Sequence, residues 1–367
     1  MKSIITVVII TSFFASAVYP QNHFVESDTA CQDCTHGGFG LVYQNNGIYF
    51  GNSRNNNGIR FNIIDCGIER INGINITFWK PLPSPGSEIN GIALGLMPDA
   101  GDLNGISIGL GAVIAERSMN GINLGILANV SQGEINGLNI AGLALISKRD
   151  LSGINIGGLA LVAQGEISGF NIGTLALVSQ KNIYGVNISG LASVAQENIY
   201  GINIGGLALV SQKSIYGINS AGLALVSQQK ITGMNLAGLA LVAQGGITGI
   251  NFGGIAIVGG EEALTGLNFT VGKLYAGTAV TGLNIAGYNV ETENLTGLNI
   301  TAGWVKTDNL TGFSISSFHR ITGLQQGLVI GILNITESLQ GIQLGLINIV
   351  KSNPVPFGIL PVINFRF

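Results

Sequence analysis

Hydrophobic and polar residues recur along this chain with a period of 16 residues. Each unit between residues 135 and 259 places an apolar residue on either side of an asparagine and then ends in an apolar run, as in ISGFNIGTLALVSQKN and IYGINIGGLALVSQKS. The glycines that mark the period are Gly137, Gly153, Gly169, Gly185, Gly201, Gly217, Gly233 and Gly249. A short fixed period indicates one supersecondary unit stacked beside its copies, each burying a face that its neighbour supplies.

The units predict strands and exclude helices. Each unit carries two or three glycines, and a glycine inside a helix costs about 1 kcal/mol relative to alanine. Strand alternation divides the unit at residues 167–180 between two faces. One face holds Ile167, Gly169, Asn171, Gly173, Leu175, Leu177 and Ser179, and the other holds Ser168, Phe170, Ile172, Thr174, Ala176, Val178 and Gln180. The predicted fold class is therefore all-β.

The favoured architecture is an antiparallel, transmembrane-type β-barrel of about 20 to 22 short repeat strands. The second face is apolar in nearly every copy, and ten or more copies make far more apolar surface than the 300 to 600 Å² patches that soluble monomers tolerate. In this barrel Ile154 and Ile172 face lipid, whereas Asn155 faces the lumen. The tyrosines at strand ends form part of an interfacial aromatic girdle, namely Tyr184, Tyr200 and Tyr216.

The alternative is a parallel β-solenoid with 16-residue rungs. Residues 157–158 are then a corner, and the side chains of Ile154, Ile156, Leu159 and Leu161 all point into one dry core. An up-and-down barrel alternates its turns between two compartments and is expected to show a 32-residue period. The likeness of successive copies therefore favours the solenoid.

The C-terminal strand favours the barrel. The chain closes on PVPFGILPVINFRF, in which apolar residues alternate and the last residue is aromatic. This ending resembles the closing strand of bacterial outer-membrane barrels, and we interpret Phe365 and Phe367 as a candidate assembly signal. A solenoid is expected to end in a polar cap.

The composition narrows the classes of function. Charged residues make up 10% of the chain against roughly 25% in average soluble domains, the 56 glycines are far above average usage, and the formal net charge is -3. No basic or acidic block is present, which argues against a nucleic-acid partner.

The N-terminal residues have the layout of a secretory signal peptide. Lys2 precedes an apolar run that ends in small residues, and at about 15 residues this run is shorter than the ~20 that span a bilayer. We expect a signal peptide over residues 1–20, an N-terminal segment with a cysteine pair over residues 21–35, and a single β repeat domain over residues 36–367. In an exported chain, Cys31 with Cys34, or one of them with Cys66, is a candidate structural disulfide.

Few residues suit catalysis or metal binding. The chain has three histidines, His23, His36 and His319, which offer little to a triad or a multi-histidine metal site. We therefore expect no enzyme, no cofactor and no metal, although His319 with Arg320 is a candidate lining for a pore constriction. The repeated asparagines are expected to form an amide ladder between neighbouring strands. They are Asn139, Asn155, Asn171, Asn187, Asn203, Asn219, Asn235 and Asn251.

The units GLVIGILNITESLQ and GIQLGLINIVKSN, together with the aromatic ending, resemble the bacterial surface-repeat proteins first described as leptospiral lipoproteins. The resemblance covers about residues 69–367 and implies an exported, envelope-associated protein of unknown biochemical role. The chain departs from the lipoprotein members because no cysteine stands at the expected cleavage region.

We accordingly expect an outer-membrane or surface β-repeat protein with a structural or passive channel role. Its expected partners are membrane lipid and the outer-membrane assembly machinery. The alternative is a secreted or surface β-solenoid that acts in adhesion, binding or self-assembly.

Overall fold

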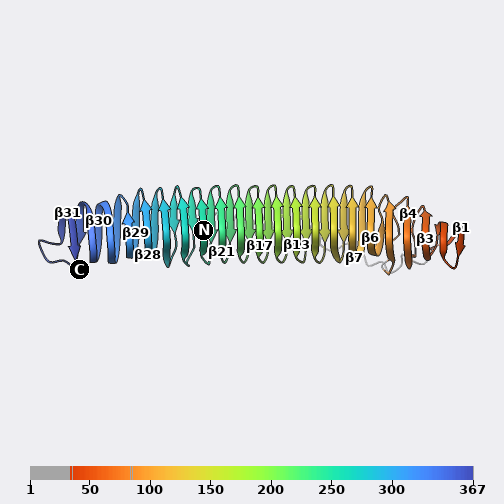
Figure 1. Cartoon of the computed structure of the whole chain (residues 1–367), viewed down its shortest axis with the longest axis horizontal. Coiled ribbons are helices and arrows are strands. Elements are labelled where there is room, and N and C mark those ends of the chain that lie inside the picture. The colour runs from red at the N-terminus through yellow and green to blue at the C-terminus, as the bar shows by residue number, and fades with distance from the viewer. Residues whose placement is uncertain (1–33, 35, 83, 85, 367) are drawn as a thin grey trace.

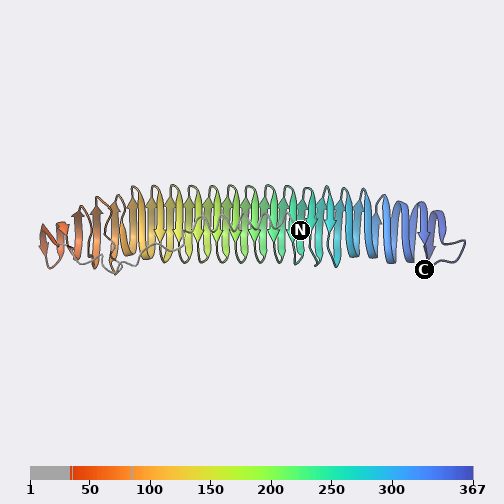
Figure 2. The same ribbon diagram turned by 180° about the vertical axis from the view of Figure 1, so that it is seen from behind.

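The chain forms a long, straight rod of stacked rungs (Figures 1 and 2). The structure is a computed structural model that describes residues 34, 36–82, 84 and 86–366. Within these residues the chain folds into 31 strands of one sheet. The strands follow one another along the rod in chain order, so the all-β prediction is confirmed.

Each rung of the regular central part contains one long and one short strand. The long strands are β9 (Glu134–Ala141), β11 (Leu151–Gly157), β13 (Ile167–Gly173), β15 (Ile183–Ser189), β17 (Ile199–Gly205), β19 (Ile215–Ala221), β21 (Ile231–Ala237), β23 (Ile247–Gly253), β25 (Leu264–Thr270) and β27 (Ala279–Ala286). The short strands are β8 (Ala128–Ser131), β10 (Ala144–Ser147), β12 (Ala160–Ala163), β14 (Ala176–Ser179), β16 (Ala192–Ala195), β18 (Ala208–Ser211), β20 (Ala224–Ser227), β22 (Ala240–Ala243), β24 (Ala256–Val258) and β26 (Lys273–Tyr275).

The two ends of the rod contain longer, less regular strands. At the N-terminal end lie β1 (Gly37–Tyr43), β2 (Asn46–Asn52), β3 (Asn55–Asn62), β4 (Arg70–Thr77), β5 (Glu88–Gly95), β6 (Asp99–Gly109) and β7 (Ala112–Gly125). At the C-terminal end lie β28 (Asn289–Thr301), β29 (Trp304–Ile315), β30 (Phe318–Val350) and β31 (Ile359–Arg366).

Neighbouring rungs pair in parallel, position by position. Asn155 lies opposite Asn171, which lies opposite Asn187, so like residues stack in columns along the rod. Among the described strands the pairing is antiparallel only at the two ends, between β1 and β2 and between β30 and β31.

Each long strand is bent at its recurring glycine. In β13 the side chains alternate between inside and outside up to Ser168, but Gly169 and Phe170 both lie on the outside before Asn171 points inward. The break coincides with a φ of +106° at Gly169, a backbone conformation that side chains with a Cβ rarely adopt. A Cβ at Gly169 would also lie 2.0 Å from the carbonyl oxygen of Gly153 in the preceding rung. The same rung bends twice more, at residues 174–175 and at residues 180–182. Three bends of this kind divide each central rung into three short arms.

The rung interior is filled by side chains. Three fully buried columns run through the central part, and in one rung they are represented by Ile167, Asn171 and Leu177. The apolar members join one continuous hydrophobic cluster that extends from Ile68 to Val329.

The predicted barrel is therefore wrong, and the alternative solenoid is the observed fold. Parallel pairing explains why successive copies look alike, since every unit occupies an equivalent rung. The positive-φ glycine interrupts what alternation had treated as one straight strand. The corner at residues 157–158 does lie beside a bend, yet of the four residues assigned to a dry core only Leu161 is buried, whereas Ile154 and Leu159 are 47% and 43% exposed.

We expect Gly201→Ala to destabilise the rod by about 3 kcal/mol or more, because strain at positive φ adds to a steric clash. Gly201 has a φ of +107°, and its Cβ would lie 2.1 Å from the carbonyl oxygen of Gly185. Thermal unfolding followed by circular dichroism measures the effect. Gly86→Ala is the control, since an added Cβ there meets no atom within 4 Å. Equal melting temperatures for the two variants would contradict the assigned bend.

Candidate functional site

The asparagines predicted to form a ladder lie in one buried column. Each donates Nδ2–H to Oδ1 of the asparagine in the next rung, and the N···O distances are 2.8 to 2.9 Å. The column also includes Asn123 at one end and Asn268, Asn284 and Asn299 at the other. Sequence reasoning missed the last three because the spacing changes to 17 after Asn251 and to 15 before Asn299. It missed Asn123, which keeps the 16-residue spacing to Asn139, because the regular repeat was followed only from residue 135.

The ladder is polarised. Every amide donates toward the C-terminal end of the rod, so the amide dipoles align and reinforce one another. At its two ends the ladder leaves buried atoms without a hydrogen-bond partner, Oδ1 of Asn123 and Nδ2 of Asn299. This column holds the rungs in register from the inside.

We expect Asn203→Ala to cost about 2 to 5 kcal/mol, because it leaves buried Nδ2 of Asn187 and buried Oδ1 of Asn219 without partners. The matched control is Asn72→Ala. Asn72 belongs to an exposed asparagine ladder with Asn57 and Asn90, where water replaces the lost bonds. Chemical denaturation measures both changes, and an equal loss of stability would show that burial of the inner ladder is not the cause.

His319 lies in the core and lines no pore, contrary to the interpretation from sequence. Its Nε2 is 2.9 Å from Oγ of Ser314, and its Nδ1 is 2.9 Å from Oδ1 of Asn334. This is the order of a nucleophile, a base and an orienting group, but all three side chains are at most 1% exposed. Ser314 follows Asn299 in the asparagine column, whereas His319 lies opposite Val305, in the column that contains Leu177. The three residues therefore join two core columns, and Asn334 in turn donates to Asn348 at 2.8 Å.

Burial lowers the pKa of His319 from 6.5 to about 4. The unfolded chain therefore binds a proton more readily than the folded chain below about pH 6.5. We expect the rod to lose stability as the pH falls from about 6.5 to about 4, by about 3 kcal/mol in total. The measurement is the free energy of unfolding at a series of pH values.

His319→Asn is the variant that tests this assignment, since it should remove that part of the pH dependence. Asp99 contributes with the opposite sign, because burial and the nearby Glu116 raise its pKa to about 7. Its contribution to stability falls as the pH rises from about 4 to about 7. A pH dependence that is the same with and without His319 would contradict the assignment.

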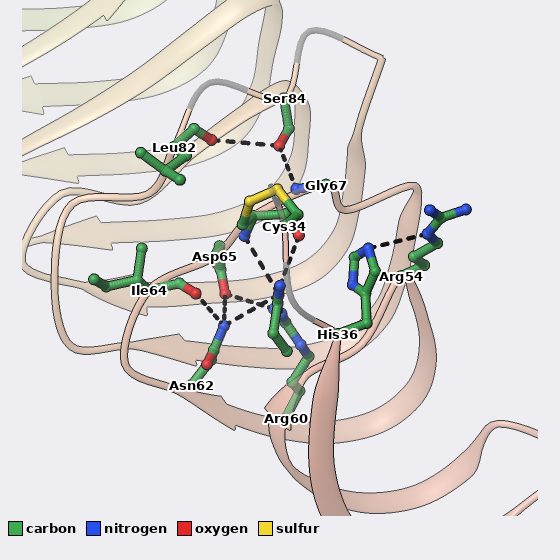
Figure 3. The surroundings of a disulfide bond; sticks show 12 residues. Cys34, His36, Arg54, Arg60, Asn62, Ile64, Asp65, Gly67, Leu82 and Ser84 are labelled. Carbon is green, nitrogen blue, oxygen red and sulfur yellow. Dashed lines mark hydrogen bonds and ion pairs between the residues drawn. A yellow bond between two sulfur atoms is a disulfide. The ribbon is translucent and has the colours of Figure 1, made fainter. Parts of the chain in front are cut away.

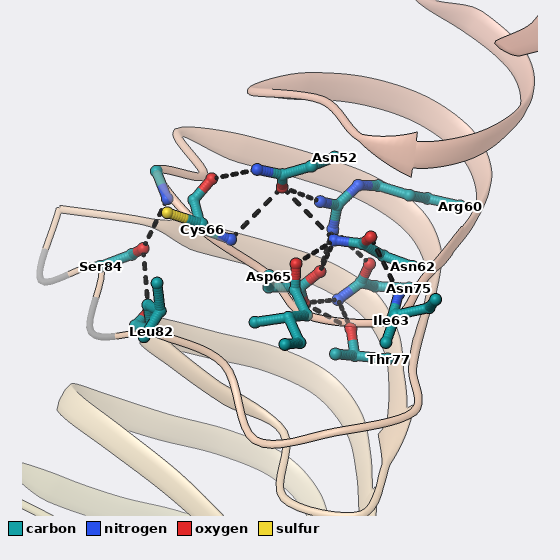
Figure 4. Close-up of polar contacts among 12 residues, drawn as sticks. Asn52, Arg60, Asn62, Ile63, Asp65, Cys66, Asn75, Thr77, Leu82 and Ser84 are labelled. Carbon is teal, nitrogen blue, oxygen red and sulfur yellow. Dashed lines mark hydrogen bonds and ion pairs between the residues drawn. The ribbon is translucent and has the colours of Figure 1, made fainter. Parts of the chain in front are cut away.

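A disulfide and a buried ion pair close the core near the N-terminal end (Figures 3 and 4). Cys34 is bonded to Cys66, whereas Cys31 lies outside the described residues. Arg60 occupies the position of the inner asparagine, opposite Asn75, and its Nη1 lies 2.6 Å from Oδ1 of Asp65. Both charged side chains are essentially unexposed. Loss of one partner of such a buried pair typically costs about 3 to 5 kcal/mol. We therefore interpret this cluster as a structural element that stabilises the N-terminal end of the core.

The outer surface carries the candidate functional site, which we call the isoleucine face. It consists of two outward columns, located one and three residues after the bend glycine. The first column is Leu41, Ile48, Ile59, Ile74, Ile92, Ile106, Ile122, Leu138, Ile154, Phe170, Val186, Ile202, Ile218, Met234, Ile250, Leu267, Leu283, Leu298, Phe313, Leu328, Ile342 and Phe365. The second column runs beside it from Phe39 to Ile363 and contains one polar residue, Ser220.

A leucine ridge follows the isoleucine face at the second bend. Its members stack through backbone hydrogen bonds from each rung to the next, and their exposed fractions are 41 to 61%. They are Leu127, Leu143, Leu159, Leu175, Leu191, Leu207, Leu223, Leu239 and Ile255.

Beyond the ridge lies an alanine–valine face formed by the short strands. Its outward columns run from Ala112 to Ala256 and from Ile114 to Val258, and stacked positions are alanine in the first and valine or isoleucine in the second. Further along, Lys273, Glu291 and Lys306 interrupt this face with ion pairs of 2.8 and 2.9 Å.

The remaining side of the rod is polar. The column before the bend glycine, which we call the polar edge, begins with asparagines and continues with serines, tyrosines and threonines up to Thr311. Tyr184, Tyr200 and Tyr216 stack here at centroid distances of 4.9 and 5.0 Å, so they form no girdle at strand ends.

All charged residues between positions 118 and 258 lie at the third bend, between the alanine–valine face and the polar edge. They are Glu134, Lys148, Arg149, Asp150, Glu166, Lys181, Glu197, Lys213 and Lys230. Four of them form two ion pairs between neighbouring rungs, Arg149 with Glu134 at 2.9 Å and Lys213 with Glu197 at 3.2 Å. The central rod is therefore amphipathic in cross-section.

Phe365 lies in β31 opposite Ile342, where it continues the isoleucine face. Phe367, the other residue of the candidate assembly signal, lies outside the described residues. Among the described residues, no three histidine, cysteine, aspartate or glutamate side chains are grouped closely enough to hold a metal ion.

The described part of the chain contains no helix with the length and apolar character needed to cross a membrane. Comparison of the chain with protein-family models, with curated proteins and with solved structures finds no match.

Proposed function

We propose that this protein is an exported, elongated structural β-solenoid that acts by binding through its isoleucine face, in adhesion or self-assembly at a cell surface. The observation that carries the proposal is the continuity of that face. Its first column is apolar at every position from Leu41 to Phe365, including the two end strands that pair antiparallel.

The size of the face supports a binding role. With strands about 4.8 Å apart, roughly 20 stacked strands and a width of about 10 Å give close to 1,000 Å². The largest apolar patch on a typical monomeric protein is about 300 to 600 Å², and larger ones mark interaction sites. These side chains lie outside the rung interior, so the filling of the core does not account for their apolar character.

Export is supported by the Cys34–Cys66 disulfide, because such bonds persist mainly in oxidising compartments. The resemblance to leptospiral-type surface-repeat proteins agrees with a location at the cell surface. A passive channel was expected from a barrel lumen, and the filled rungs of a solenoid favour the structural role instead.

We expect the triple variant Ile154→Lys, Ile218→Lys and Met234→Lys to keep its fold and to lose self-association or surface binding. Each of these side chains is 47 to 51% exposed, so a lysine there keeps its charge in water. Circular dichroism reports the fold, and analytical ultracentrifugation with adsorption to an apolar surface reports binding.

The inward control is Leu209→Lys, at 0% exposure, which should unfold neighbouring rungs because it buries an unpaired charge. If the triple variant unfolds as the control does, the face is not external. If it stays folded and binds as the original protein does, the isoleucine face is not the binding surface.

A further inference from the structure

The apolar surface of the central rod is a wedge. The isoleucine face and the alanine–valine face meet at the leucine ridge, and all charge between positions 118 and 258 lies at the third bend, on the far side of the alanine–valine face. Around one rung the surfaces follow in the order polar edge, isoleucine face, leucine ridge, alanine–valine face and third bend, which carries the charges. A partner that shields this apolar surface from water must therefore contact two faces and the convex ridge between them.

A rigid partner does not cover this shape. A second copy packed face to face would lie about 10 Å away across one flat face, and it would leave the ridge and the other apolar face in water. Fluid acyl chains, in contrast, follow both sides of a convex ridge. The shape of the wedge therefore favours lipid over a second copy.

The dimensions also suit a lipid interface. A rung arm of about four residues is roughly 13 Å long at ~3.3 Å per residue, and interfacial elements bury their apolar side ~5 to 10 Å into the boundary between headgroups and acyl chains. The ridge and the nearer half of each apolar face enter the acyl region at that depth. The third bend and the polar edge stay among the headgroups and in water.

We propose that the central rod lies along a lipid surface with the leucine ridge inserted among the acyl chains. This inference rests on the proposed function and names lipid as the partner. Because the charges at the third bend are of both signs and partly paired between rungs, the attraction is apolar. Binding should thus depend little on salt or on anionic lipid.

The test is flotation of the full chain with phosphatidylcholine vesicles, with and without phosphatidylserine and at low and high salt. We expect wild-type protein to float under all these conditions. The variant Leu159→Asp, Leu191→Asp and Leu223→Asp should lose at least ten-fold in vesicle partition. It should keep its β-sheet spectrum, since these leucines are 43 to 45% exposed.

The control places the same three charges on the polar edge, as Thr232→Asp, Thr265→Asp and Thr296→Asp, and should float like wild type. Light scattering on wild type and both variants without lipid separates the two proposals. If wild type assembles with itself and does not bind vesicles, the lipid inference fails while the proposed self-assembly through the isoleucine face stands. If wild type neither floats, nor associates with itself, nor adsorbs to an apolar surface, both proposals fail. Equal loss of flotation in the two variants would also overturn the lipid inference, because the effect would be one of net charge.

Discussion

The close approach of glycine backbones between rungs is the constraint on which this architecture depends. At Gly169, Gly185 and Gly201 the space that a Cβ would fill is occupied by the carbonyl oxygen one rung earlier, 2.0 to 2.1 Å away. The same glycines hold φ near +105°, so a side chain is excluded both by contact and by conformation. The bend that they create turns the strand and decides which later residues face inward. The faces, the ridge and the buried columns all follow from it.

The interior contains an uncommon mixture of apolar columns and one polar column. A buried amide costs free energy unless its donor and acceptor are both satisfied, and stacking like residues in register satisfies them for every rung but the last at each end. The polar column thus makes register specific, because a slip by one residue would leave each Asn171-type amide against an apolar neighbour. Burial of the Ile167 and Leu177 columns contributes the hydrophobic free energy that offsets the loss of conformational entropy when the chain folds.

Local alternation in the sequence was informative, and its failures are instructive. It assigned Ile167, Asn171 and Leu177 to one side and Phe170 and Ile172 to the other, as the structure has them. It failed at Gly169 and Leu175, which lie outside, because strict alternation continues through bends that it does not detect. Parallel pairing also follows from the likeness of adjacent units, but the aromatic ending drew the interpretation toward a barrel. That ending does form an antiparallel strand, β31, which closes a parallel stack.

Other features had no signal in a single sequence. His319 and Arg60 occupy core columns near the two ends of the rod. The spacing of the units is irregular there, so the repeat does not identify inward positions. The partner of Cys66 was one of several options that spacing left open.

The position-by-position register makes the length of the rod proportional to the number of repeat units. Because each unit occupies one equivalent rung, gain or loss of a whole 16-residue unit changes the length by about 4.8 Å and leaves the cross-section unchanged. Nearly identical neighbouring units are also the substrate for unequal recombination of the coding sequence. The length of the rod is thus free to vary between descendants in uniform steps, with the two antiparallel end strands carried along intact.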